Sequence, residues 1–142
     1  MGRYHFVDGI ALADCAVDVE GADLPDLFAT AARALAEVMV DPETVATSVR
    51  RRITLEAPEL DLLLYDWLSE LIFRKDRDGE VYVRTEVDIE GDGPFRLSAA
   101  VEGGVLDPGH ADLRSDPKAV TFHQFVLERA EHGWRARIVI DI

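Results

Sequence analysis

Two aspartates, Asp14 and Asp141, lie where their carboxylates could bind a metal ion. Alternating apolar residues adjoin each of them, so in a β-strand each carboxylate would point away from the core. The α-carboxylate of Ile142 lies beside Asp141. If the two strands are neighbours, this cluster of oxygens, without sulfur or paired imidazoles, favours a hard cation. We expect a divalent ion, with Ca²⁺ as the first choice and Mg²⁺ or Mn²⁺ as alternatives. Solvated carboxylates on an acidic surface are the other interpretation.

The segment Lys118–His123, with the sequence Lys-Ala-Val-Thr-Phe-His, offers a second kind of chemistry. A lysine can anchor a phosphate, and a histidine titrates near neutral pH and can act as an acid or a base. The two residues are five positions apart, however, and an unbulged strand would point them to opposite faces. The residues alone therefore favour an amphipathic strand over a catalytic pair.

Several familiar catalytic and binding motifs are absent from the sequence. It has no Gly-x-Gly-x-x-Gly, P-loop or Gly-x-Ser-x-Gly motif, and its other histidines have no spacing typical of a zinc site. Cys15 falls on the apolar side of a predicted strand, where a thiol is usually inert. Trp67 and Trp134 fit core positions better than exposed platforms for base stacking. We therefore predict that the protein is not an enzyme.

The charge of the chain restricts its partners. Asp and Glu number 28 against 15 Lys and Arg, which gives a formal net charge of −13. Tight binding of nucleic acid usually needs clustered basic residues that displace counterions, and the densest cluster here, Arg50-Arg51-Arg52, opens a predicted strand. We expect no tight direct binding of RNA. A metal ion or a basic protein suits this surface better.

The elements that would position these residues follow from the apolar periodicity. Alternation predicts strands, and apolar residues at helical spacing predict two helices. Asp23 is expected to cap the first helix, with Pro25 in its first turn, and Asp41-Pro42 ends it. The predicted elements are strands at 4–8 and 15–20, a helix from 24 to about 40, a strand at 47–56, a helix from 59 to 74, and strands at 81–89, 95–101, 118–128 and 134–142.

Two helices among mostly antiparallel strands predict an α+β fold: a single two-layer domain over residues 1–142, with the helices packed on the sheet. No apolar run approaches the roughly 20 residues that cross a bilayer, and the N-terminal segment lacks the apolar stretch of a signal peptide. Cys15 is the only cysteine, so an internal disulfide is excluded. We expect a cytoplasmic protein without membrane contact. The oligomeric state stays open.

Taken in order along the chain, these segments resemble the archease family, and the resemblance covers essentially the whole chain. The matching segments are the early aspartate motif, Gly21 before the first helix, the segment Leu-Leu-Tyr-Asp-Trp-Leu-Ser-Glu-Leu at 63–71, the segment at 118–123, and Asp141-Ile142. Each is moderately specific alone. Together, at these positions, they are quite specific.

The resemblance implies an accessory protein rather than an enzyme. Archeases act with the RtcB-type RNA ligase of tRNA splicing and RNA repair, promoting its guanylylation and its multiple turnover. The family's metal site uses an aspartate of the early motif and one near the C-terminus, which match Asp14 and Asp141. The carboxylate of Ile142 is a further candidate ligand. Lys118 and His123 become candidate cofactor-binding residues.

The early motif departs from the family pattern. The usual His-Thr-Ala-Asp reads here as Gly9-Ile10-Ala11-Leu12-Ala13-Asp14, which is longer and lacks the histidine. His5 is a candidate to take its place in space. The metal interpretation rests on the aspartates and is independent of the histidine.

Two other functions are compatible with these residues. The first is a metal-dependent phosphoester hydrolase, in which Asp14 and Asp141 hold the ion and His123 acts as the base. The second is a protein-interaction module in which a metal ion is merely structural. Turnover of a phosphoester by the isolated protein would favour the hydrolase.

Overall fold

The computed structural model describes residues 2–7, 14–107, 109 and 111–142, with the backbone alone at positions 123 and 124. These segments form two α-helices, a short 3₁₀-helix and seven β-strands. In chain order the elements are β1 (Arg3–Val7), β2 (Asp14–Gly21), α1 (Leu24–Met39), η1 (Pro42–Thr44), β3 (Val49–Ala57), α2 (Leu60–Asp78), β4 (Glu80–Gly91), β5 (Phe95–Val105), β6 (Ala119–Ala130) and β7 (Gly133–Asp141).

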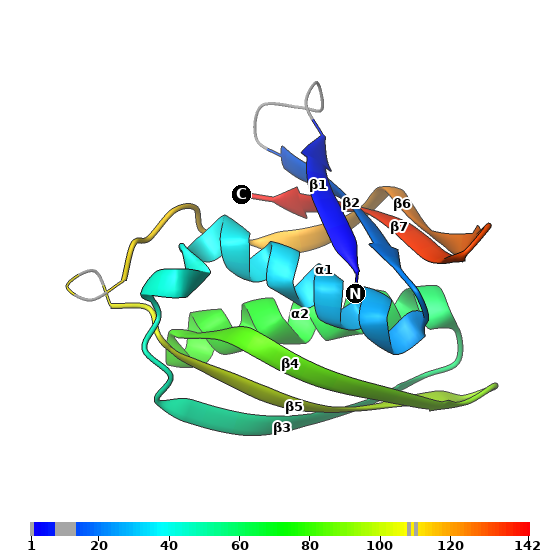
Figure 1. Ribbon diagram of the computed structural model, residues 1–142, viewed down its shortest axis with the longest axis horizontal. Coiled ribbons are helices and arrows are strands. Elements are labelled where there is room, and N and C mark those ends of the chain that lie inside the picture. The colour runs from blue at the N-terminus through cyan, green and yellow to red at the C-terminus, as the bar shows by residue number, and fades with distance from the viewer. Residues whose placement is uncertain (1, 8–13, 108, 110) are drawn as a thin grey trace.

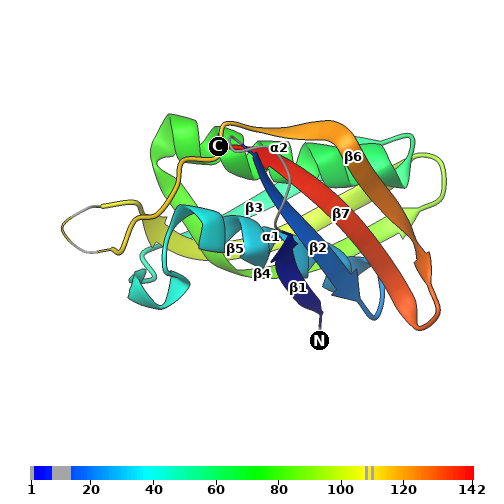
Figure 2. The same cartoon turned by 90° about the horizontal axis from the view of Figure 1, so that it is seen from above.

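The strands form two antiparallel sheets, and the helices lie between them (Figure 1). One sheet has the strand order β1-β2-β7-β6 and the other has the order β3-β5-β4. Helix α1 contacts β2 and β4, from opposite sheets, and α2 contacts β6 as well as β3 and β4. In the view from above, β7 runs between β2 and β6 (Figure 2). Both sheets and both helices therefore enclose one core.

Helix α1 is apolar around most of its circumference, which explains why a sheet covers it on each side. Ten of its sixteen residues are buried. Its N-terminus is capped as predicted, because the Asp23 carboxylate accepts a hydrogen bond from the Asp26 N–H at 2.8 Å. Gly21 lies so close to α1 that a Cβ there would collide with the backbone of Leu27. This glycine lets β2 turn directly into the helix.

Buried side chains near the middle and at the end of helix α2 form hydrogen bonds with neighbouring elements. Trp67 is fully buried, and its indole N–H donates to the Phe28 carbonyl of α1 at 3.0 Å. Lys75, in the last turn, is also buried; its amine donates to a carboxylate oxygen of Asp116 and, at 2.7 Å, to the Pro117 carbonyl. The helix therefore holds both α1 and the segment that leads into β6.

The α+β class and the predicted order of elements are confirmed. The strands divide into two sheets with the helices between them, whereas the sequence pattern suggested two layers. The second helix continues beyond residue 74 to Asp78 and is capped by Gly79, which has the left-handed φ of 68° that favours glycine. Neither described helix combines the length and apolarity needed to cross a membrane.

Candidate functional site

Asp14 and Asp141 lie together at one end of the two central strands of the four-stranded sheet, a place that we call the Asp14–Asp141 corner. The antiparallel register of β2 and β7 places them directly opposite each other. Both are half-buried, and both point away from the core, because their neighbours Cys15 and Ile140 pack against it. Side chains of such opposite residues have Cβ atoms about 5 Å apart. The fold thus brings two carboxylates from the two ends of the described chain onto one surface.

The other carboxylates on this face of β2 have basic partners. Arg137 lies opposite Asp18 and donates to both of its oxygens, at 2.7 and 2.8 Å. Glu20 likewise pairs with an arginine. Asp14 instead faces another carboxylate, and within the described residues neither Asp14 nor Asp141 forms an ion pair with a basic side chain. Like charges placed directly opposite each other are destabilising, so this pair lacks a compensating charge.

Lys118 is held at the same corner through its backbone. Its N–H donates to the Asp141 carbonyl at 2.7 Å, and the next residue, Ala119, lies opposite Asp141 on the other side of β7. The preceding Asp116-Pro117 segment is bound by Lys75 of α2. The backbone of Lys118 is therefore held beside Asp141, and its side chain is exposed.

The donor set suits a hard divalent cation but supplies only part of its coordination. Carboxylate oxygens are the ligands that Ca²⁺ and Mg²⁺ prefer, and Ca²⁺ takes six to eight oxygens in all. No group of three or more His, Cys, Asp or Glu side chains suited to a metal occurs in the described part of the chain. An ion between Asp14 and Asp141 would need further oxygens from water, the backbone or a partner. Ile142 adjoins Asp141, with its side chain packed against the core.

The structure places His5 against Asp18 rather than against Asp14. His5 lies opposite Asp18, with its Nε2 3.5 Å from an oxygen of that carboxylate. Asp18 is four residues from Asp14, which is about 13 Å along a strand. Residues 8–13, which carry the rest of the early motif, lie outside the described residues, as does the side chain of His123.

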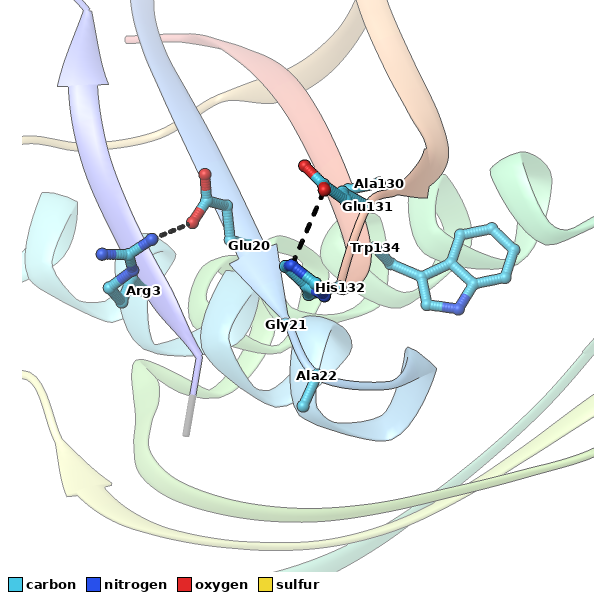
Figure 3. A pocket seen from close by; sticks show the side chains of 8 residues that line it. All are labelled: Arg3, Glu20, Gly21, Ala22, Ala130, Glu131, His132 and Trp134. Carbon is cyan, nitrogen blue, oxygen red and sulfur yellow. Dashed lines mark hydrogen bonds and ion pairs between the residues drawn. The ribbon is translucent and has the colours of Figure 1, made fainter.

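The hollow shown in Figure 3 lies at the opposite end of the same strands. It has a volume of about 390 Å³ and is formed where the β6–β7 turn meets the end of β2. Arg3 already pairs with Glu20, and the Nε2 of His132 lies 3.9 Å from a carboxylate oxygen of Glu131. The hollow therefore offers a ligand little unmatched charge. The Asp14–Asp141 corner is the stronger candidate because its charges are uncompensated.

Strand β6 is irregular, which the sequence analysis did not anticipate. Its register with β7 shifts between Thr121 and Val126. The residues that pack against the core accordingly change from an even position, Val120, to the odd positions Phe125 and Leu127. The parity argument that separated the lysine from the histidine assumed an unbulged strand, so it does not apply to β6. The change from even to odd apolar positions was the available signal.

Three aromatic side chains gather at this irregularity, and the sequence analysis missed them. The rings of Tyr65 on α2 and Phe122 on β6 are stacked, with centroids 4.3 Å apart and an angle of 12°. Phe125 meets the edges of both rings, at 6.5 and 5.4 Å. We call these three residues the aromatic cluster. Phe122 is 51% exposed, so the cluster opens to solvent.

The fold defines a small α+β protein in which two helices lie between two antiparallel sheets, and comparison with known proteins identifies its family. Residues 4–142 match the model of the archease protein family (MTH1598/TM1083). The chain is 33% identical to protein archease from Methanosarcina mazei, over 99% of this chain and 96% of that protein. It is 32% identical to protein archease from Archaeoglobus fulgidus, over 99% of each. The chain belongs to the archease family.

Solved structures agree with this assignment. Protein 1598 of Methanobacterium thermoautotrophicum, 31% identical, superimposes with a TM-score of 0.80 over 98% of each chain. The archease from Thermotoga maritima, described as a possible chaperone, gives a TM-score of 0.69 over 97% of this chain and 98% of that one. That protein is only 18% identical, so its likeness concerns the fold alone.

Proposed function

We propose that this protein is an accessory factor of an RtcB-type RNA ligase and that it has no catalytic activity of its own. It would promote guanylylation of the ligase and its multiple turnover in tRNA splicing or RNA repair. Membership of the archease family supports this function. We further propose that residues 1–142 act as one unit and that the protein works in the cytoplasm. A chain with a single cysteine forms no internal disulfide, so its folding needs no oxidising environment.

The proposed metal site rests on one observation: Asp14 lies opposite Asp141, and neither carboxylate has a basic partner among the described residues. A divalent ion, Ca²⁺ first and Mg²⁺ or Mn²⁺ as alternatives, would neutralise the two carboxylates. The carboxylate of Ile142 is proposed as a further ligand. When bound, the ion would supply positive charge and open coordination positions to the ligase or its nucleotide.

Lys118 and His123 are proposed to assist at the same corner. The side chain of Lys118 is exposed and its backbone is bonded to Asp141, so it can offer a positive charge to a phosphate without leaving the site. We assign His123 no separate chemical step. The side chain of His123 would contact the same phosphate-bearing group as Lys118.

The test is ligation of RNA with 3′-phosphate and 5′-hydroxyl ends by a limiting amount of the cognate ligase, with GTP and a divalent metal. The wild-type protein should convert single turnover into multiple turnover. Asp14→Asn and Asp141→Asn should each reduce this stimulation at least about 10-fold, as loss of metal-site groups generally does. Asp88→Asn, at an exposed position on β4 in the other sheet, is the matched control and should act like the wild type.

A second measurement separates loss of the ion from loss of the fold. Because Asp14→Asn removes a like-charge contact, it should leave the metal-free melting temperature unchanged or higher. Ca²⁺ should raise the melting temperature of the wild type, through binding to the folded state, but not that of the variant. Equal stabilisation of both proteins by Ca²⁺ would contradict this metal site, and a wild type without effect on the ligase would contradict the function.

A further inference from the structure

We infer that a groove beside β6 is the docking site for a positively charged, amphipathic segment of the partner ligase. This inference rests on the proposed function, because it names the ligase as the occupant. The groove has a volume of about 530 Å³ and lies between the start of α2 and the second half of β6. Its apolar walls include Phe95, Phe125, Val126 and Trp134.

The groove continues into the aromatic cluster, since Phe125 belongs to both. Phe122 lies 5.4 Å from Phe125, and the exposed fractions of Phe122 and Val126 are 51% and 40%. Exposed apolar side chains that adjoin one another, rather than being scattered, mark interaction surfaces. Leu62 and Tyr65 of α2, both half-buried, extend the same surface along the helix. The partner segment therefore needs apolar side chains.

The charge of the rim indicates that the segment must also be basic. Glu59, Asp61 and Glu128 line the groove. Glu128 is paired with Arg135, but within the described residues Glu59 and Asp61 have no ion pair with a basic side chain. The rim therefore carries excess negative charge, as does the whole chain, whose net charge is −13. Lysine or arginine side chains that flank an apolar stretch would complement it.

The same charges disfavour two other occupants. RNA could stack a base on Phe122, but its phosphates would then approach the uncompensated carboxylates of Glu59 and Asp61. The basic residues nearby are already engaged, Arg135 with Glu128 and Arg129 over the ring of Trp134 at 4.9 Å. A second copy of this chain would bring the same acidic rim and another net charge of −13.

The aromatic cluster, at which the groove ends, lies on the side of the groove nearer to the Asp14–Asp141 corner. Ala119, at the start of β6, lies opposite Asp141, and Phe122 follows three residues later, about 10 Å along the strand. A ligase that reaches the Asp14–Asp141 corner can therefore place a neighbouring segment over the aromatic cluster. The groove would supply affinity, while the aspartates act on the ligase.

The experiment measures equilibrium binding of the purified cognate ligase to the full-length protein and, in parallel, stimulation at saturating protein. Phe122→Ser removes an exposed ring, and Glu59→Lys reverses a charge at a residue whose side chain makes no capping bond to α2. Each should weaken binding about 10-fold, as hot-spot substitutions do, while stimulation at saturation is retained. Glu86→Lys, an exposed position of β4, makes the same charge change outside the groove and should bind like the wild type.

The possible outcomes distinguish a failure of the groove inference from a failure of the proposed function. Asp14→Asn should bind normally and fail to stimulate. If both groove variants bind the ligase as the wild type does, the groove inference is wrong and the proposed function stands. If the wild type neither binds nor stimulates the ligase, both are wrong. If the protein alone binds fluorescent RNA and Phe122→Ser abolishes that binding, the groove is an RNA surface and protein docking is overturned.

Discussion

At the scale of single residues, Asp18 and Arg137 explain how an acidic strand remains stable next to the candidate site. Hydrogen bonds from Arg137 lower the pKa of Asp18 below its ordinary range, and they outweigh its partial burial, which acts in the opposite direction. The nearby His5 adds a smaller effect of the same sign as Arg137. Asp14 has no such partner within the described residues, so Asp14 and Asp18 lie in different electrostatic environments on the same strand.

The Asp18 pair predicts a specific dependence of stability on pH. Because the pKa of Asp18 is lower in the folded than in the unfolded chain, the pair stabilises the fold above about pH 4. That contribution is lost as the pH falls through the lowered folded value. Asp18→Asn should therefore slightly lower the urea midpoint at pH 7, and the difference from the wild type should shrink toward zero in strong acid.

Urea titrations of both proteins at pH 7 and at about pH 2.5 check this, since the lower value lies below ordinary carboxyl pKa values. Asp88→Asn, at an exposed position without an ion pair in the described residues, should show no difference at either pH. A gap between Asp18→Asn and the wild type that stays the same in acid would show that the pair is not the cause.

At the scale of elements, the buried amine of Lys75 links the end of α2 to the segment before β6. Burial opposes the charged form, but hydrogen bonds from its amine to Asp116 and Asp76 raise the pKa of Lys75 overall. The amine also donates to the Pro117 carbonyl at 2.7 Å. Lys118 follows immediately, so α2 fixes the position at which the chain enters the candidate site.

Lys75→Met keeps most of the buried side chain but removes these bonds. We expect the free energy of unfolding to fall by about 1–3 kcal/mol, the usual range for losing hydrogen bonds to charged groups. The Lys118 N–H, which is bonded to Asp141, should exchange with solvent faster. Urea denaturation and amide hydrogen exchange measure the two effects. Arg77→Met, an exposed position in the same turn, should change neither.

The helices and strands could be predicted because their signals are local. Apolar spacing and the Asp23 cap fix α1, and alternation fixes the faces of β2 and β7, including the outward direction of Asp14 and Asp141. The register that pairs these aspartates depends on contacts between distant parts of the chain, which no local pattern encodes. The same holds for the division into two sheets and for the bond between Lys75 and Asp116. The register shift in β6 is the exception, because the change of its apolar residues from even to odd positions is a local signal.

At the scale of the whole molecule, the net charge of −13 governs how partners approach. Opposite charges on a basic ligase would accelerate encounter, and dissolved salt largely screens this attraction at separations beyond about 10 Å at 0.1 M. The attraction acts before any groove or metal is engaged. It therefore affects the rate of association more than the lifetime of the complex.

The association rate constant with the ligase should fall about 10-fold or more between low salt and 0.5 M salt, while the dissociation rate constant changes less. Stopped-flow or surface-binding kinetics over a series of salt concentrations measure both constants. Glu59→Lys and Glu86→Lys change the net charge equally, so they should have similar salt slopes although only the first weakens docking. A rate that does not depend on salt would exclude electrostatic steering.

The central place of β7 has a consequence for how the protein is made. During translation β2 and α1 leave the ribosome early, whereas β7, which joins β2 to β6, follows every other described strand. A nascent chain that has not reached residue 133 leaves β2 without its inner neighbour. Asp14 meets Asp141 only after the β6–β7 hairpin has docked onto β2. An unfinished chain therefore cannot present the paired carboxylates, and the corner becomes available only on a molecule in which β7 has paired with β2.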